Sequence, residues 1–367
     1  MSKGRKVLFC CPLPPPVHGQ AYVSQLAFQG YEGPKLVISQ NYENKPKIIR
    51  ALLTLAFFAK FLFKLGWYNP TTIYFTCSRT VLGAIKDLWL LFWGGYIFRK
   101  TIIVHLHGSD FRSFYNSAPS AYRVLLSWLY KYVSTAIVLT NEMQEQFQMF
   151  PKLKINVLPN FYDPILDKAT DRYPDTSVTV ASAKILFFSN VMYSKGVFQL
   201  LDAFLKLTEK YPEIECHLAG KIAGDSHLSA FEVDEKFKTY LHHQKIVYHG
   251  LVSASTKAKF LNGGDIFVLP SFYRSEAFPV SFIEALRAGN YVITTAVGYH
   301  AATVDKVVGR VIENHEVDTI LEAIDFCLTN PELIVQAKSR NREFAVANFS
   351  YAAFKQGFHA IISGAGN

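Results

Sequence analysis

Short apolar runs and longer amphipathic stretches alternate along the first 160 residues. The apolar runs are rich in Val, Ile and Phe and predict strands, whereas the amphipathic stretches have the period of a helix. The expected strands are 6–11, 35–39, 72–77, 101–108, 135–140 and 155–160, and the expected helices are 18–29, 47–65, 81–98, 120–133 and 142–150. This alternation predicts a parallel sheet with helices on both faces.

The alternation begins again after a polar stretch at 162–184, whose Pro, Ser, Thr and Asp residues predict a linker. The second set of expected strands is 185–190, 215–221, 246–250, 265–271 and 290–295, with helices at 196–211, 231–243, 255–264 and 278–289. The predicted fold class is therefore α/β, with two Rossmann-like, doubly wound domains facing a central cleft. We expect the domains at 1–165 and 180–349, with a terminal helix in 350–367 crossing back to the first. Ligands of such sheets bind beyond the carboxyl ends of the strands.

The composition indicates a packed protein with an anionic partner. Half of the 367 residues are apolar, and the formal net charge of +9 suits nucleotide phosphates, an acidic membrane surface or nucleic acid. A nucleic-acid partner is disfavoured because the chain has no basic-aromatic cluster, and a nicotinamide enzyme because no G-x-G-x-x-G follows a strand. Five scattered cysteines without a CxxC pair favour reduced, cytosolic thiols over disulfides or a zinc site.

Segment 47–68 is the most apolar part of the chain, but Arg50, Lys60 and Lys64 interrupt it before the length of about 20 residues that a spanning helix needs. At about 100° per residue, its cations fall within one arc of roughly 140°. Two interpretations stay open: a helix that lies in the inner leaflet of a membrane, or a surface helix that buries its apolar face in its own domain. The first predicts a peripheral protein on the cytoplasmic face of the membrane.

Several segments that follow expected strands carry candidate binding residues. Gly19 opens the first helix after a Pro-rich turn, where backbone N–H groups can approach a ligand closely. His107 at the end of 101–108 is expected to reach the cleft, whereas His105, two residues earlier, is expected to face the other side and pack in the core. Lys195 precedes a helix N-terminus, and a cation there favours anion binding. Leu251, which follows another strand, could pack on a base.

Two acids, Glu276 and Glu284, stand eight positions apart in the segment from 275 to 295. Pro279 suits a first helical turn, so Glu276 is expected in the loop before a helix and Glu284 about one turn inside it, both facing one cleft. A carboxylate can accept hydrogen bonds from two vicinal hydroxyls, such as those of a ribose. Alternatively, it is a structural acid that pairs with a lysine.

Taken together, these segments resemble a family 4 retaining glycosyltransferase with the GT-B fold. The family's E-x7-E signature matches Glu276-x7-Glu284, and YSKGVFQLLDAF at 193–204 resembles its lysine-glycine phosphate loop. The stretch from 248 to 271 resembles the base-side segment, and LPNFYD, which contains Asn160, resembles the approach to the linker. The match is strong over 185–300 and weak in the N-terminal half.

The resemblance implies a nucleotide-diphosphate sugar as donor. Glu284 would hold the ribose, Lys195 the diphosphate, and Glu276 and His107 the donor sugar, so that Glu276, His107 and Lys195 are the implied catalytic residues. Further implied donor contacts are Gly19, Asn190, Gly220, Lys221, Leu251, Phe278, Pro279 and Val280. No D-x-D occurs in the chain, so we expect no metal and no cofactor, with lysine and backbone dipoles stabilising the leaving diphosphate.

The sequence departs from the family pattern at two positions. Asn190 stands where the family usually has an Arg, which removes a guanidinium able to bind phosphate in a bidentate way. Lys221 or Arg274 could substitute. His18 stands where the family often has Gly.

The expected function is transfer of a hexose or amino-hexose to a glycan acceptor, lipid-linked, in bacterial O-antigen, capsule or other cell-surface polysaccharide synthesis. Two alternatives stay open: a GT-B nucleotide-sugar epimerase or hydrolase, and a non-catalytic membrane-associated binding subunit.

Overall fold

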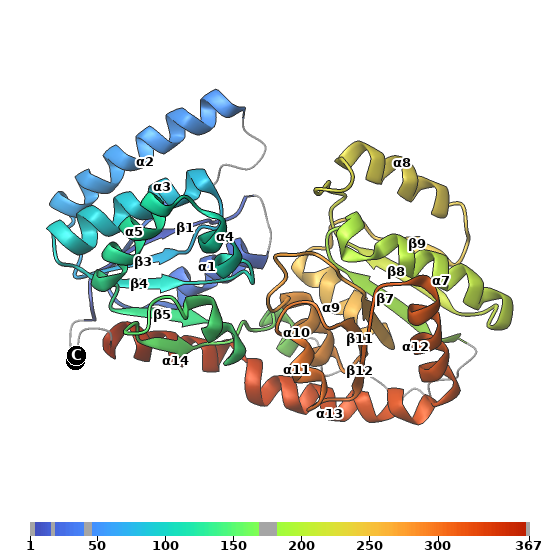
Figure 1. Cartoon of the computed structure of the whole chain (residues 1–367). Coiled ribbons are helices and arrows are strands. Elements are labelled where there is room, and N and C mark those ends of the chain that lie inside the picture. The colour runs from blue at the N-terminus through green and yellow to red at the C-terminus, as the bar shows by residue number, and fades with distance from the viewer. Residues whose placement is uncertain (1–3, 16–18, 40–45, 169–181, 365–367) are drawn as a thin grey trace. The chain divides into compact units, whose positions relative to one another are not determined.

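The structure is a computed structural model that describes residues 4–15, 19–39, 46–168 and 182–364. The chain divides into two compact units (Figure 1): unit 1 comprises Met1–Asn160 and Ala352–Asn367, and unit 2 comprises Phe161–Tyr351. Each unit contains one six-stranded sheet in which all neighbouring strands are parallel. The α/β class predicted from the alternation of strands and helices is confirmed.

The sheet of unit 1 has the strand order β2-β1-β3-β4-β5-β6. Its central strands are buried along their whole length, because helices cover both faces, and this explains why they read as continuous apolar runs. The strands are β1 (Val7–Cys11), β2 (Lys35–Ser39), β3 (Thr72–Thr76), β4 (Thr101–His105), β5 (Thr135–Val138) and β6 (Ile155–Val157).

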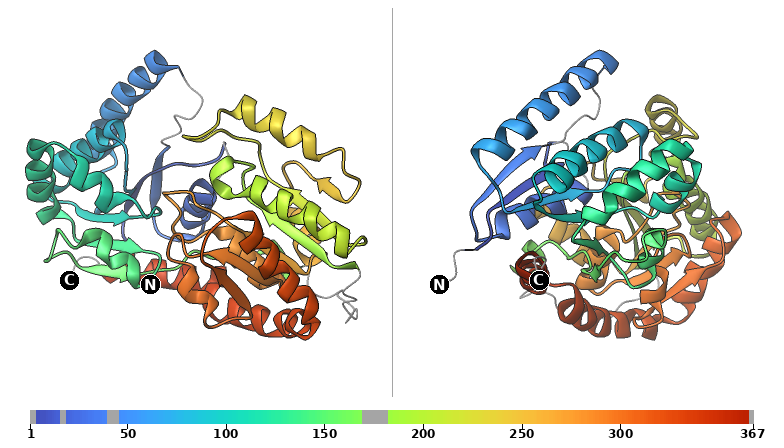
Figure 2. Two further views of the ribbon diagram at one scale, coloured as in Figure 1. Left: turned by 45° about the vertical axis from the view of Figure 1, so that its right-hand side comes forward. Right: turned by 60° about the vertical axis from the view of Figure 1, so that its left-hand side comes forward.

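Two sets of helices cover the two faces of this sheet (Figures 1 and 2). One face carries α2 (Lys47–Trp67), α3 (Val81–Leu90), the π-helical η1 (Leu91–Ile97), α4 (Phe111–Ser117) and α5 (Ser120–Leu129), and the other carries α1 (Gly19–Gly30) and α14 (Tyr351–Gly364). Phe358 of α14 lies 5.3 Å from Tyr74 of β3 between ring centroids, which fixes the terminal helix on unit 1. The short helices η2 (Tyr130–Tyr132) and η3 (Glu142–Phe147) complete the unit.

The single helix expected over 81–98 changes type part-way. From Leu91 the helix widens, and the Phe98 N–H bonds the Trp93 carbonyl five residues back. A Cβ on Gly94 would lie 2.5 Å from Ile73 of β3, so the glycine allows the widened turn to pack directly on the sheet.

Helix α2 combines features of both interpretations of segment 47–68. Phe57, Phe61 and Leu65 are buried against unit 1, as expected for a surface helix that packs in its own domain. A second apolar set on the same helix is nevertheless exposed: Ile48, Ile49, Leu52, Leu55, Phe63 and Trp67. Among the described residues, no helix has both the length and the apolar character needed to cross a membrane.

The sheet of unit 2 has the order β12-β11-β10-β7-β8-β9. Its strands are β7 (Lys184–Phe188), β8 (Glu215–Ala219), β9 (Ile246–Tyr248), β10 (Ile266–Leu269), β11 (Tyr291–Thr295) and β12 (Gly309–Ile312). Its helices are α6 (Ile165–Lys168), η6 (Tyr193–Lys195), α7 (Val197–Lys210), α8 (Ala230–Tyr240), α9 (Ala254–Asn262), α10 (Val280–Ala288), α11 (Ala301–Val304), α12 (Val317–Thr329) and α13 (Pro331–Phe349).

The part of unit 2 from β12 to α13 contains elements that the sequence did not predict. β12 has only four residues and is partly exposed, so it has no clear alternation. A tertiary contact holds it in place: the amide of buried Asn341 on α13 accepts a hydrogen bond from the Val308 N–H at 2.6 Å and donates to the Val308 and Asn290 carbonyls at 2.8 Å.

Candidate active site

The topology of unit 2 predicts where a ligand should bind. β7 lies between β8 and β10, so the chain moves outward in opposite directions from the β7–β10 pair. This is a topological switch point, and ligands of doubly wound sheets bind outside the carboxyl ends of the strands there. The loop after β7 carries Lys195, and the loop after β10 carries Glu276.

These two loops lie in direct contact. Gly196 has φ +74°, and a Cβ at this position would lie 2.1 Å from the Pro270 carbonyl oxygen. Only glycine tolerates both the left-handed backbone and this approach. Asp225 fixes the first loop, because its carboxylate accepts the Ser194 N–H at 2.7 Å and the His227 N–H at 2.8 Å. The loop that presents Lys195 is therefore held in one geometry.

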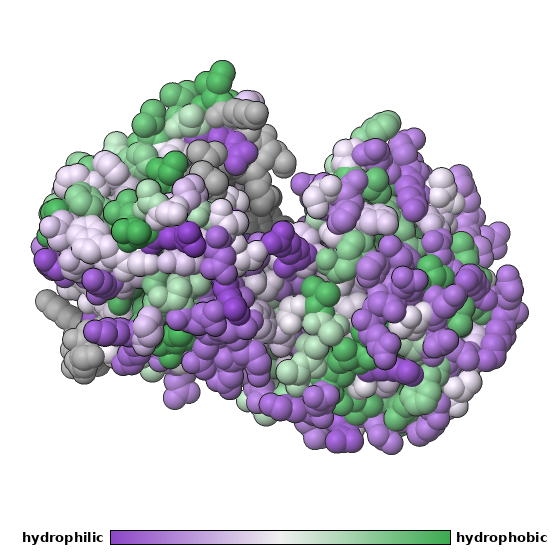
Figure 3. All heavy atoms as spheres, viewed as in Figure 1, coloured by the Kyte–Doolittle hydropathy of each residue, from purple (hydrophilic) through white to green (hydrophobic). Residues whose placement is uncertain are grey.

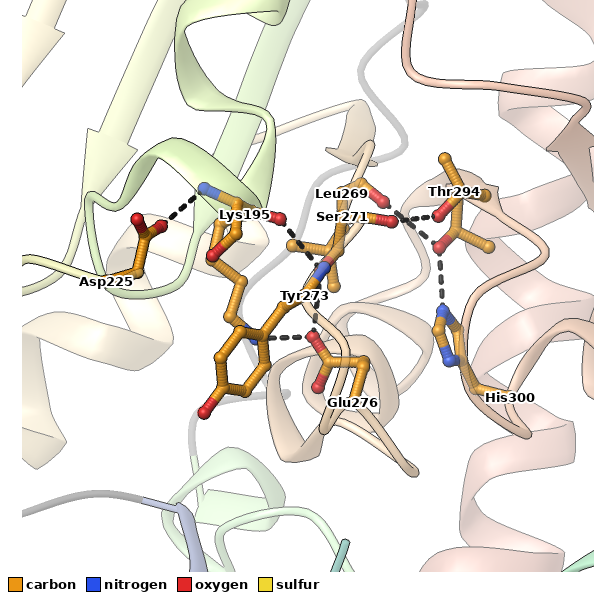
Figure 4. A network of polar contacts seen from close by, with 10 residues as sticks. Lys195, Asp225, Leu269, Ser271, Tyr273, Glu276, Thr294 and His300 are labelled. Carbon is orange, nitrogen blue, oxygen red and sulfur yellow. Dashed lines mark hydrogen bonds and ion pairs between the residues drawn. The ribbon is translucent and has the colours of Figure 1, made fainter. Parts of the chain in front are cut away.

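Lys195 and Glu276 form an ion pair across the two loops (Figure 4), with side chains 12% and 8% exposed. The Ser271 hydroxyl also donates to the Glu276 carboxylate at 3.1 Å. Burial acts to raise the pKa of Glu276, but Lys195 and Ser271 outweigh it and the pKa lies below its usual value. Glu276 is therefore an ionised, buried carboxylate at neutral pH.

His300 stands beside this pair and was not predicted from the sequence. Its Nε2 lies 2.7 Å from the Thr294 hydroxyl at the end of β11, and Figure 4 shows both residues next to the Glu276 network. Burial lowers the pKa of His300 to about 4, although the nearby Glu276 opposes this shift. The imidazole is thus neutral at pH 7. His300 lies outside the E-x7-E segment, so no motif pointed to it.

Glu284 belongs to a second buried network. Lys257 of α9 donates to Glu284 of α10 at 2.8 Å and to Asp163 at 2.9 Å. Burial raises the pKa of Glu284, and Lys257 offsets part of this rise; the pKa of Lys257 is itself raised, because its two carboxylate partners outweigh burial. Neither Lys257 nor Asp163 was predicted, although pairing of an acid with a lysine was one interpretation of the motif. Among the described residues, no hydrogen bond or ion pair joins Glu276 to Glu284 directly.

The N-terminus of α10 lies between the two acids in sequence. The helix begins at Val280 with Pro279 as its cap, as the sequence suggested. Pro279 has no N–H, so of the three implied donor contacts at this helix start only Phe278 and Val280 could donate a backbone hydrogen bond to a ligand. The Phe278 ring is buried against Phe349 at 5.4 Å between centroids, so only its backbone could contact a ligand.

The remaining unit 2 candidates follow β7, β8 and β9. Asn190 and Lys221 are exposed, and Leu251 is 71% exposed, an unusual environment for a large apolar side chain. Gly220 has φ +149°, donates its N–H to the Gly250 carbonyl at 2.9 Å, and would place a Cβ 1.8 Å from the Ser189 carbonyl oxygen. The ends of these three strands are therefore packed closely at the carboxyl edge of the sheet.

Unit 1 contains the other candidates at the carboxyl edge of its own sheet. Gly19 is the first residue of α1, and His18 lies outside the described residues. His105 is fully buried, and its Nδ1 lies 2.7 Å from the Tyr74 hydroxyl, consistent with a core position. The prediction that His105 and His107 face opposite sides is wrong, because residues two apart in an extended chain point to the same side, and the ring centroids lie 3.9 Å apart.

Within the described ranges, no three His, Cys, Asp or Glu side chains gather as a possible metal-ligand set. The loops at the switch point carry the Lys195–Glu276 ion pair and lead into the N-terminus of α10. The arrangement can therefore hold an anion through a lysine and backbone N–H groups.

Comparison with solved structures identifies the fold. A sucrose-phosphate synthase from Thermosynechococcus elongatus superposes with a TM-score of 0.74 at 16% identity, covering 96% of this chain and 97% of that one. Anabaena Alr3699/HepE, solved in complex with UDP-glucose, superposes with a TM-score of 0.71 at 17% identity over 98% of this chain and all of the other. The fold is GT-B. The fold predicted from the resemblance is thereby confirmed.

A family model also matches the sequence of most of unit 2. Residues 176–344 match the family model of the glycosyl transferases group 1, a stretch that contains both the Lys195 and Glu276 loops. One component of the human phosphatidylinositol N-acetylglucosaminyltransferase is 29% identical over 144 residues, which is 39% of this chain and 27% of that protein.

An uncharacterized glycosyltransferase, MJ1607 of Methanocaldococcus jannaschii, is 31% identical over 114 residues, 31% of this chain and 27% of that protein. The chain thus spans about a quarter of the length of these two curated relatives.

Proposed function

We propose that the chain is a retaining glycosyltransferase of family 4 that moves a hexose or amino-hexose from a nucleotide-diphosphate sugar to a glycan acceptor. One observation carries the proposal. At the β7–β10 switch point, two loops in direct contact present Lys195 and Glu276 beside the N-terminus of α10. The family-model match covers this whole site, and the neighbour Alr3699/HepE was solved with UDP-glucose, UDP and glucose.

In the proposed reaction, the diphosphate leaves with additional negative charge. Lys195 and the first N–H groups of α10, which have no acceptor within the helix, stabilise that charge without reorganising. Glu276 holds the Lys195 ammonium in place through its ion pair. The site needs no metal and no cofactor in this proposal, because a fixed ammonium and a helix dipole take the place of a cation.

Glu284 is proposed to accept hydrogen bonds from the two ribose hydroxyls of the donor. This role requires an ionised carboxylate, which burial alone would disfavour. Lys257, 2.8 Å away, supplies the counter-charge. The exposed Leu251 is proposed to pack on the base. Lys221 is proposed to bind the diphosphate in place of the arginine that Asn190 replaces, with Gly220 as a further donor contact.

Glu276 and His107 are proposed to contact the transferred sugar. His300 extends the proposed set, because it is neutral at pH 7 and lies beside Glu276. Its ring is held by the Thr294 hydroxyl and adds no charge to the site.

The acceptor is proposed to be a lipid-linked glycan of bacterial surface-polysaccharide synthesis. In support, one curated relative is named for a transfer to phosphatidylinositol, a lipid. An epimerase or hydrolase with the same fold would consume the donor without an acceptor, and a non-catalytic binding subunit would bind the donor without consuming it.

The test is a thermal-shift screen of the chain with UDP, GDP, ADP and dTDP. At about 100 times its dissociation constant, a ligand should stabilise the protein by roughly 2.7 kcal/mol. We expect one nucleoside diphosphate to give a clearly larger shift than the others, and Glu284→Ala to weaken that binding. Equal small shifts for all four, unchanged in Glu284→Ala, would contradict the proposed donor site.

A further inference from the structure

The exposed large hydrophobic side chains of unit 1 all gather on one set of helices. We call the outward side of α2, α3, η1 and α5 the helical layer; it includes Phe98, which directly follows η1. Among the described residues of unit 1, every exposed large hydrophobic side chain lies on it: Ile48, Ile49, Leu52, Leu55, Phe63, Trp67, Ile85, Ile97, Phe98, Val124 and Leu125. None lies on α1 or α14, which cover the other face of the same sheet.

On α2 the exposed residues form a stripe. Ile48, Leu52 and Leu55 follow one another at spacings of four and three, and Phe63 and Trp67 continue the same side of the helix with rings stacked 6.1 Å apart. Figure 3 shows hydrophobic side chains gathered over α2. The helix already packs on unit 1 through another face, so this stripe adds nothing to the core. An apolar surface of this kind is typical of an interaction site.

The same part of the chain carries all of its excess positive charge. Of the 38 basic and 29 acidic residues, eleven and two lie between 47 and 133, so the rest of the chain has 27 of each. Both acids in the segment are engaged: Asp87 is buried and accepts from Ser78, and Asp110 pairs with Arg79 at 2.5 Å. Among the described residues of 47–133, the helical layer therefore presents cations such as Arg50 and Lys60 without an exposed acid of the same segment.

All four tryptophans of the chain belong to the helices that form this layer, one each in α2, α3, η1 and α5: Trp67, Trp89, Trp93 and Trp128. Trp67 is 70% exposed at the end of the apolar stripe. Tryptophan prefers the boundary between hydrocarbon and water in membranes.

Beside α5 the layer is hollowed by an open cavity of about 530 Å³. Arg123 and Lys131 supply two cations to its lining, the Tyr115 and Ser127 hydroxyls lie 2.8 Å apart within it, and Trp128 and Val124 form apolar wall. Two cations and hydroxyls next to an exposed apolar side chain suit a phosphate group carried on a lipid.

We propose that the helical layer docks on a bilayer that contains anionic phospholipids, with the α2 stripe in the interface and the α5 cavity receiving a lipid phosphate. Apolar insertion combined with basic side chains is how interfacial helices bind membranes. A second copy of the chain fits poorly, because pairing two such layers would bring their positive charges together. The proposal is independent of glycosyl transfer, since it rests on unit 1 alone.

The test is co-sedimentation of the full chain with vesicles of phosphatidylcholine alone or with about one-third phosphatidylglycerol. We expect binding to the anionic vesicles, weakened by salt, and weak binding to phosphatidylcholine. Leu52→Gln/Phe63→Gln should lower the affinity more than tenfold. Each cation removed, as in Lys60→Gln or in Arg123→Gln at the cavity, should lower it about fivefold. The matched control is Phe231→Gln in unit 2, whose side chain is 73% exposed outside the layer and whose loss should change nothing.

Two further readouts make the outcome decisive. Tryptophan emission should shift to the blue with anionic vesicles in the parent chain but not in Leu52→Gln/Phe63→Gln, while the circular dichroism spectra of both stay the same. Absence of binding to anionic vesicles, or equal binding by the double variant and the Phe231→Gln control, overturns the proposal. So does a dimer in vesicle-free buffer that the double variant converts to a monomer, because the stripe would then bind a second copy.

Discussion

Replacing Lys257 by Met tests whether the second buried network has the structural role that its geometry implies. Lys257 Nζ lies 2.9 Å from Asp163 and 2.8 Å from Glu284, and the three side chains are 14%, 8% and 3% exposed. Methionine keeps the length and apolar stem of lysine but removes the charge. Two buried carboxylates would then remain without their shared counter-ion.

The size of the effect follows from the burial. Removing one partner of a buried ion pair typically costs about 3–5 kcal/mol, because an uncompensated charge stays inside the protein. In a domain of 150–250 residues, 1 kcal/mol lowers the melting temperature by about 2–4 °C. Lys257→Met should therefore lower the melting temperature of unit 2 by roughly 6–20 °C.

The distribution of tryptophans allows the two units to be followed separately. All four lie in unit 1, so tryptophan emission reports unit 1, whereas far-ultraviolet circular dichroism reports both units. Lys257→Met should lower the melting temperature of the part of the dichroism transition that belongs to unit 2. The melting temperature followed by tryptophan emission should stay the same. Lys210→Met is the matched control, because the Lys210 side chain is 58% exposed in its pair with Asp325 and surface ion pairs contribute little to stability.

The pH dependence gives a second check on the same variant. Burial already raises the pKa of Glu284, and without Lys257 it should rise further, so this acid takes up a proton as the pH falls and its burial becomes less costly. The difference between Lys257→Met and the parent chain should then be smaller at pH 5 than at pH 8. A decrease in the melting temperature of unit 2 of less than about 2 °C, or one equal to that caused by Lys210→Met, would refute the reasoning.

Three further predictions concern other parts of the chain. Lys195→Ala should lower the transfer rate about 10²–10³-fold with little change in acceptor KM, measured by initial rates; an unchanged rate would exclude Lys195 from the diphosphate site. Burial raises the pKa of Asp87 to about 7, so the folded state holds a proton that the unfolded state releases near pH 4, and unfolding free energy falls by about 4 kcal/mol as the pH rises from 4 to 7. Asp87→Asn should flatten this profile in urea unfolding followed by tryptophan emission, and an equally steep profile in the variant would contradict the assignment. Gly196→Ala should destabilise unit 2 by at least about 1–3 kcal/mol from its left-handed backbone alone, seen by circular dichroism; a change below about 0.5 kcal/mol would mean that the loop adapts.

The short-range repeat of apolar positions along the sequence was enough to predict the architecture. The alternation of apolar runs and helical stretches gave the α/β class, and the E-x7-E spacing located the loop and helix that hold Glu276 and Glu284. Both features depend on residues close together in sequence. The expected start of α10 near Pro279 also follows from local backbone chemistry, since proline suits the first turn.

Features set by tertiary contact could not be read in the same way. Lys257 and Asp163 meet Glu284 from segments 27 and 121 positions away in the chain, so no spacing rule joins them. The contact between the His105 and His107 rings is the exception, because residues two apart on a strand share a face and their contact could have been predicted. The α2 pattern predicted one apolar face, but the packing shows two, only one of which is needed by unit 1.

The most direct test of the central claim measures release of nucleoside diphosphate from the preferred nucleotide sugar, with and without a lipid-linked glycan acceptor. The parent chain should release it in proportion to glycosylated product and only when the acceptor is present, and Lys195→Ala should do so at least about 100-fold more slowly. Release at the same rate without acceptor would indicate a hydrolase. Equal rates for the parent chain and Lys195→Ala would contradict the site proposed at the β7–β10 switch point.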